Sequence, residues 1–173
     1  EVPIATMLIK YKHGSMLWHT YSHIDGWFFI NEAIPADATV SLWFTYGDKW
    51  KIVREGSSAA YNYTIGTHKE LSDQRLVVSR DLPFFEIHRA VNFYYHGEHE
   101  IPKIKYLFGT LKIEAMNGMT GSGSSGAFKF NPCINAYSKI GKTDRNNPGV
   151  IIGTTLNEIG HCVHYNLINR NDY

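Results

Sequence analysis

The stretch that decides the fold is Thr154-Thr-Leu-Asn-Glu-Ile-Gly-His-Cys-Val-His-Tyr165, near the end of the 173-residue chain. On a helical wheel at about 100° per residue, its side chains separate into two faces. The apolar face, which predicts contact with a core, comprises Leu156, Ile159, Val163 and Leu167. The polar face comprises Asn157, His161 and His164, with Glu158 beyond them. The pattern predicts an amphipathic helix that lines a cleft.

Residues 157–161 read Asn-Glu-Ile-Gly-His and differ by one letter from the zinc motif H-E-x-x-H. In that motif two histidines one helical turn apart bind the ion, and the glutamate activates the metal-bound water. Asn157 stands in the place of the first histidine, and a side-chain amide is a poor zinc ligand. Two interpretations therefore stand: the chain keeps a zinc chemistry, or it keeps only the helix that once carried it.

A purely structural interpretation fits the same residues. Thr155-Leu-Asn-Glu158 has the spacing of a capping box, in which Glu158 would only satisfy backbone N–H groups at a helix start. His161 and His164 would then be partly buried, hydrogen-bonded histidines.

The surrounding residues carry a resemblance to a family. Residues 153–165, G-T-T-x-N-E-I-G-H-x-x-H-Y, resemble the T-T-I-H-E-L-G-H-A-S-H core of gluzincin-type zinc metallopeptidases, which are secreted or lipoprotein proteins of gut bacteria. Residues 85–97 resemble the aromatic A-x-x-Y-Y-Y-G helix of that family, and Leu111-Lys-Ile113 resembles its L-K-I strand. The resemblance covers residues 80–170.

The resemblance implies peptide hydrolysis by zinc-activated water. Glu158 takes the position of the general base, His161 that of a zinc ligand, and Asn157 that of the other helix ligand, while His164 is a further candidate ligand. In this family a later helix supplies the third ligand, a glutamate. Residues 162–173 contain one acid, Asp172. Since a catalytic zinc site wants three protein ligands, we expect a domain truncated at its C-terminus or a site built differently.

A function from another class competes with the enzyme. In this alternative the chain is a non-catalytic exported protein that holds a peptide or a glycan in the inherited cleft. The resemblance also implies export, to the periplasm, the outer membrane as a lipoprotein, or the medium. In such a setting Cys133 and Cys162 would be able to form a bridge, whereas the other interpretation is two buried thiols.

The N-terminal part differs in composition. All four tryptophans lie within the first fifty residues: Trp18, Trp27, Trp43 and Trp50. They suit either a small core or sugar binding, and we favour the core. Alternation predicts strands over 7–11, 27–30 and 40–46, and Asp25-Gly26 predicts a hairpin turn. This part resembles a transthyretin-like or carboxypeptidase-regulatory β-sandwich. Five histidines, at positions 13, 19, 23, 96 and 99, are expected at the surface or at a helix end.

We therefore expect an α+β fold in three parts. Residues 1–65 form a small β-sandwich, 66–80 form a linker within the polar segment 55–80, and 81–173 form a partial zincin-like domain of helix, mixed sheet and motif helix. The first helix is capped by Ser79 or Asp81, ends near Tyr95 and stops at Gly97. Strands follow over 103–116 and 134–140, separated by the glycine- and serine-rich run 117–126.

Charge and hydropathy argue against nucleic-acid binding and against a transmembrane segment. A formal net charge of +1 without a basic cluster argues against nucleic-acid binding. The chain lacks an apolar run of about eighteen residues, so we expect no transmembrane segment. The expected partner is a peptide or protein substrate, or a glycan.

Overall fold

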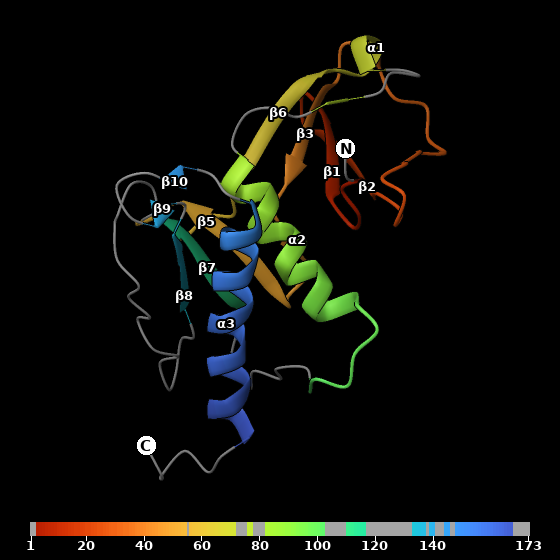
Figure 1. The fold of residues 1–173 in the computed structure, drawn as a ribbon. Helices are drawn as coiled ribbons and strands as arrows, with labels where there is room; N and C mark the ends of the chain where they lie inside the picture. The colour runs from red at the N-terminus through yellow and green to blue at the C-terminus, as the bar shows by residue number, and fades with distance from the viewer. Residues whose placement is uncertain are drawn as a thin grey trace.

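The computed structural model describes residues 3–54, 56–71, 76–77, 82–102, 110–116, 133–137, 139–140, 144–145 and 148–167 (Figure 1). It contains sheets and helices in similar proportion, so the expected α+β class is confirmed. The helices are α1 (His68–Leu71), α2 (Leu82–His96) and α3 (Pro148–Leu167). The strands are β1 (Leu8–His13), β2 (Met16–Tyr21), β3 (Thr39–Trp43), β4 (Thr45–Tyr46), β5 (Trp50–Arg54), β6 (Asn62–Thr67), β7 (Leu111–Met116), β8 (Cys133–Tyr137), β9 (Lys139–Ile140) and β10 (Asp144–Arg145).

The first sheet has the order β2-β1-β3-β6 and is antiparallel throughout. Gly14, in the left-handed region with φ 57°, forms the tight turn between β1 and β2. Alternate residues bury one face of the sheet, with Ile9 and Tyr11 on β1 beside Val40 and Leu42 on β3. The other face carries the intervening side chains and is described below.

The second sheet has the order β4-β5-β7-β8. Strands β4 and β5 are antiparallel, whereas β5, β7 and β8 run parallel. Residues 50–54 of β5 pair with residues 111–115 of β7, so this sheet takes strands from both sides of the expected division at 66–80. The division itself, and the transthyretin-like sandwich within it, stay predictions. A separate two-stranded sheet joins β9 and β10.

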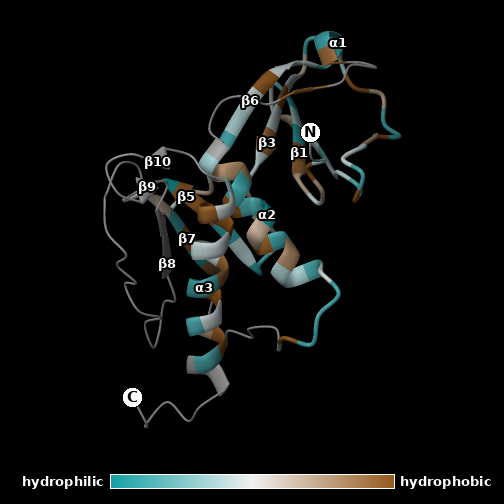
Figure 2. Cartoon of the chain, in the orientation of Figure 1, coloured by the Kyte–Doolittle hydropathy of each residue, from teal (hydrophilic) through white to brown (hydrophobic). Residues whose placement is uncertain are grey.

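Helices α2 and α3 lie side by side against the second sheet (Figure 1). Helix α2 contacts β5 and β7, and α3 contacts β8. Their brown, hydrophobic stretches in Figure 2 contribute to one buried cluster that also includes the inner face of the first sheet. Its largest fully buried side chains are Trp50, Tyr94, Phe44, Met7, Ile9, Ile52, Ile87, Leu111, Ile113, Ile151 and Ile159. None of the helices in the described ranges is long and apolar enough to cross a membrane.

Several expected elements are present, and others are not. The expected strands 7–11 and 40–46 appear as β1 and as β3 with β4. Residues 27–30 do not form a strand, although the turn at Asp25-Gly26 does form, with Gly26 at φ 84°. The hairpin expected at Asp25-Gly26 is therefore wrong. A hairpin forms instead at the Gly14 turn, between β1 and β2, and β2 was not among the expected strands. Strand β6 lies inside the polar segment 55–80, and only its last two residues, 66 and 67, fall within the expected linker 66–80.

Helix α2 ends as expected, for a different physical reason. The N–H of Gly97 donates to the Phe93 carbonyl at 2.7 Å, and its φ is not in the left-handed region. A Cβ at this position would instead overlap that carbonyl oxygen, so close approach requires the glycine. The proposed caps Ser79 and Asp81 lie outside the described residues.

A buried histidine ties the N-terminal segment to α2. His88 is 1% exposed, and its Nε2 lies 2.9 Å from the Ala5 carbonyl oxygen, which fixes the tautomer with the proton on Nε2. The rings of Trp50 and Phe44 lie 5.2 and 6.0 Å from the imidazole, centroid to centroid. One turn further along α2, Asn92 accepts a hydrogen bond from Thr6. The core thus requires an uncharged imidazole.

This arrangement predicts acid sensitivity. Burial lowers the pKa of His88 from 6.5 to about 4, while the bond to Ala5 raises it and nearby His96 lowers it. Because the folded pKa lies below the unfolded one, the stabilisation is complete above the unfolded pKa and is lost as pH falls towards the folded one. We expect urea unfolding to show a loss of about 2 kcal/mol between about pH 7.5 and about pH 5. His88→Gln should remove most of this loss; an equal loss in that variant would contradict the assignment.

Candidate functional site on helix α3

Helix α3 carries the motif in its interior. It begins at Pro148, where the missing N–H is no disadvantage, so Thr155 lies two turns inside the helix. The Thr155 hydroxyl donates to the Ile151 carbonyl one turn back, at 2.8 Å, and the side chain is fully buried. The capping-box interpretation of residues 155–158 is therefore wrong. The expected motif helix is present.

The apolar face of α3 packs into the core. Ile159 and Val163 are buried as expected, together with Ile151 and Cys162 on the same side. Leu156 is partly buried against the cluster, and the side chain of Leu167 lies outside the described residues. The helix therefore turns the predicted apolar face towards the core.

The polar face of α3 is turned outwards. Asn157, His161 and His164 are exposed, and Glu158 is partly exposed. The Asn157 amide Nδ2 lies 3.5 Å from Glu158 Oε1, so the amide that replaces the first ligand is close to the proposed general base. The residues of the motif are therefore together on one accessible surface.

The donor set on this surface does not fit a catalytic zinc site. Across the described parts of the chain, histidine, cysteine, aspartate and glutamate form no group of three or more that is able to hold a metal ion. Asn157 offers an amide where zinc prefers an imidazole, and His161 and His164 fall one ligand short of the three required. Asp172, the only acid beyond the motif, lies outside the described residues.

The inner side of α3 also contacts α2. Cys162 is a buried thiol, in agreement with the buried-thiol interpretation, and the side chain of Cys133 lies outside the described residues. Tyr95 of α2 lies close by, and burial raises the pKa of its hydroxyl, with further increases from Tyr94 and Cys162. These groups form part of the packing between the helices.

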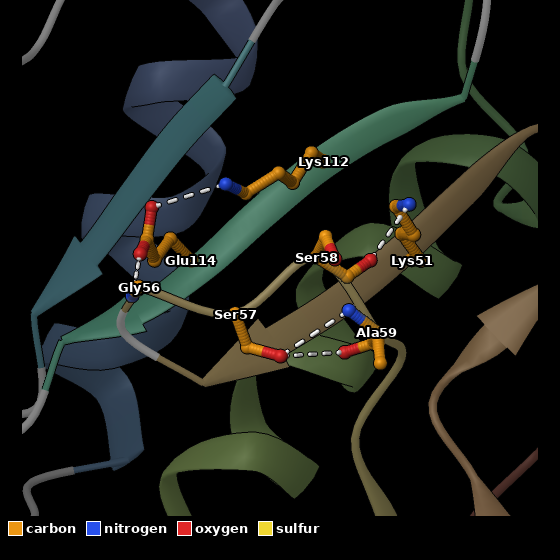
Figure 3. A network of polar contacts seen from close by, with 7 residues as sticks. All are labelled: Lys51, Gly56, Ser57, Ser58, Ala59, Lys112 and Glu114. Atoms are coloured by element: carbon orange, nitrogen blue, oxygen red, sulfur yellow. Dashed lines mark hydrogen bonds and ion pairs between the residues drawn. The ribbon is translucent and has the colours of Figure 1, made fainter.

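A network of polar contacts beside β7 has a structural role (Figure 3). The Glu114 carboxylate accepts a hydrogen bond from the Gly56 N–H and lies 3.5 Å from the Lys112 ammonium. From β5, the Lys51 ammonium donates to the carbonyl of Ser58 in the same loop, at 2.9 Å. These contacts hold the 56–59 loop against β5 and β7.

The tryptophans and histidines have mixed environments. Trp50 is fully buried and Trp18 packs against the core, but Trp27 is 71% exposed, so the core interpretation holds for only part of the group. Positions 13, 19, 23 and 96 are exposed histidines, as expected. His99 Nε2 lies 3.2 Å from the Phe93 carbonyl at the end of α2, which agrees with its expected place at a helix end.

A second polar surface lies on the outer face of the first sheet, and the sequence analysis did not identify it. A hollow of about 430 Å³ is lined by Lys10, Lys12, Gly14, Ser15, Met16, Leu17 and Trp43. The Lys-x-Lys alternation within a strand is its only local signal. Trp43, which also lines the hollow, lies on β3. Its position beside the lysines is apparent only once the strand order is known.

The rotation of α3 predicts unequal effects of two substitutions. Ile159→Ala should lower the free energy of unfolding by about 2–5 kcal/mol because it leaves a cavity in the core. His161→Ala should change it by less than about 0.5 kcal/mol because the imidazole is at the surface. Urea unfolding of both variants measures the difference. Equal destabilisation would place His161 in the core and contradict the exposed polar face.

The chain was compared with known proteins in three ways. No protein family matches it, and neither a curated protein nor a solved structure is significantly similar. The gluzincin resemblance therefore stays a proposal that rests on the quoted residues.

Proposed function

We propose that the chain is a non-catalytic binding protein that holds a peptide or a glycan against the polar face of α3. The observation that supports it is the joint exposure of Asn157, His161 and His164 on a helix whose donor set does not fit catalytic zinc. A peptidase relative that has lost its first ligand would retain such a surface. Export is part of the proposal and rests on the family resemblance alone.

The chemistry of this face suits ligands with many hydrogen-bonding groups. The Asn157 amide both donates and accepts, and a neutral imidazole offers one donor and one acceptor nitrogen. Peptide amides and sugar hydroxyls have the same dual character, so each would find partners at His161 and His164. Glu158, partly exposed beside Asn157, adds acceptor oxygens.

The competing function, zinc-dependent peptide hydrolysis, is favoured by one observation. Helix α3 is continuous through the motif, so residue 157 and His161 lie one turn apart with Glu158 beside the first position. With histidine at 157, this geometry would supply two of the three ligands and a general base. The present chain has Asn157 there, and this is why we place the binding function first.

We expect the parent chain to bind zinc weakly and Asn157→His to increase the affinity by about tenfold or more, since it supplies a second imidazole at the correct spacing. Glu158→Gln in the same background should leave the affinity almost unchanged, because this residue is a base candidate and not a ligand. Calorimetric zinc titration measures these affinities, with Asn157→Gln as the control that retains an amide. If Asn157→His gains nothing, α3 does not present these positions to a common point.

A separate assay tests the proposed class. The parent chain, dialysed against a mild chelator and supplied again with zinc, should not hydrolyse a mixed peptide substrate. Stoichiometric zinc that survives the dialysis, with hydrolysis that disappears in Glu158→Gln, would overturn the binding proposal in favour of the enzyme.

A further inference from the structure

We propose that the hollow on the outer face of the first sheet is a binding site for a carboxylate-bearing sugar chain. The inference rests on the proposed binding function, and it adds a place and a ligand class that α3 does not supply. In Figure 1 the strands of this sheet lie at the end of the molecule away from the C-terminal half of α3. The two surfaces are therefore separate.

Strand register places the cationic side chains on this face. Lys10 lies opposite His19 on β2 and Ser41 on β3, and Lys12 lies opposite Leu17 and Thr39. Because side chains alternate along a strand, burial of Ile9 and Tyr11 turns both lysines to the outer face. The core thus determines where these charges stand.

The aromatic wall of the hollow is held in place. Trp43 Nε1 donates to the Ser41 hydroxyl at 2.9 Å, which fixes the orientation of the indole. The Lys10 ammonium lies 3.9 Å from the centre of the indole ring, a distance at which the ring attracts the cation. A ligand would therefore meet a preformed pair of charge and ring, and would lose less conformational entropy on binding.

The charge of the hollow is unbalanced. Its lining contains two lysines and no acid, and across the described ranges neither Lys10 nor Lys12 forms an ion pair with a carboxylate. Lys112, by contrast, is paired with Glu114. An anionic group that enters the hollow gains two ammonium partners without breaking an existing ion pair.

The strand order favours a sugar over a peptide. An extended peptide that adds a strand pairs with an edge strand, here β2 or β6, whereas the hollow lies on the face over β1, which is bonded on both sides, to β2 and β3. Besides the two lysines, the hollow offers the indole of Trp43, the apolar Met16 and Leu17, the Ser15 hydroxyl and the backbone of Gly14. The C–H face of a sugar ring packs on such a surface, and a ring carboxylate reaches the lysines. The volume lies within the usual range for small-ligand sites, about 300–1,000 Å³.

The test titrates the full chain with oligogalacturonate, a neutral galactan oligosaccharide of equal length, and a polyglutamate peptide, by calorimetry. We expect oligogalacturonate to bind at least about tenfold more tightly than the other two, and added salt to weaken its binding because Lys12 is exposed and Lys10 partly exposed to solvent. Lys12→Gln should reduce its affinity about fivefold to tenfold. Lys69→Gln, which removes the same charge from exposed α1, is the matched control and should have no effect. Trp43→Phe should also weaken binding, with its unfolding midpoint measured to confirm the fold.

The other outcomes distinguish failure of this site from failure of the proposed function. No binding of oligogalacturonate, or equal binding by the parent and Lys12→Gln, overturns it. Tighter binding of polyglutamate would assign the face to an acidic peptide and also overturn it. If the chain binds the neutral oligosaccharide or a peptide, and His161→Ala abolishes this binding, the proposed function on α3 stands while the site at the hollow fails. Zinc-dependent hydrolysis removes the proposed function alone.

Discussion

The parallel pairing of β5 with β7 is the constraint on which the rest of the structure depends. It joins residues 50–54 to residues 111–115, so the two halves of the chain contribute to one core. Trp50 and Ile52 on β5, with Leu111 and Ile113 on β7, are completely buried. Parallel neighbours cannot be joined by a tight turn, and the intervening chain includes β6 and α2. Without this pairing, α2 and α3 would lose the sheet that they cover.

This shared core also determines what remains at the surface. Helix α3 turns Ile159 and Val163 inwards, so Asn157 and His161 are left outside. The first sheet turns Ile9 and Tyr11 inwards, which leaves Lys10 and Lys12 on its outer face. Both candidate binding surfaces are consequences of the same hydrophobic burial, and each is held mainly on regular elements, the hollow with the short turn at Gly14 and Ser15 added. Such support lets a surface recognise a ligand with little rearrangement.

Sequence reasoning worked where the signal was local and periodic. The two faces of α3 and the first strand follow from spacing alone, and the end of α2 from the glycine at position 97. It failed where contact with a distant segment of the chain determines the structure. Residues 50–54 have no local signal for pairing with a strand about sixty residues away, and the capping box at Thr155 was overridden because the helix begins earlier, at Pro148.

Other features required the strand order itself. The turn at Asp25-Gly26 formed without its hairpin, since residues 27–30 do not form a strand, and Trp27 stayed exposed. The hollow at Trp43 combines side chains of three strands, so alternation within one strand indicates only its lysines. The incomplete set of zinc ligands on α3 could be predicted from Asn157 alone. Residues one helical turn apart lie on the same face of a helix, whatever the fold around it.

One unfolding experiment tests the central claim that both halves share a core. All four tryptophans lie before residue 51, and nearly all of the described helix lies after residue 81. Urea unfolding followed by tryptophan fluorescence and by far-ultraviolet circular dichroism therefore reports the two halves separately. We expect coincident transitions with one midpoint, as for a single cooperative unit. Fluorescence and dichroism transitions with distinct midpoints would show that the halves unfold independently and would contradict the shared core.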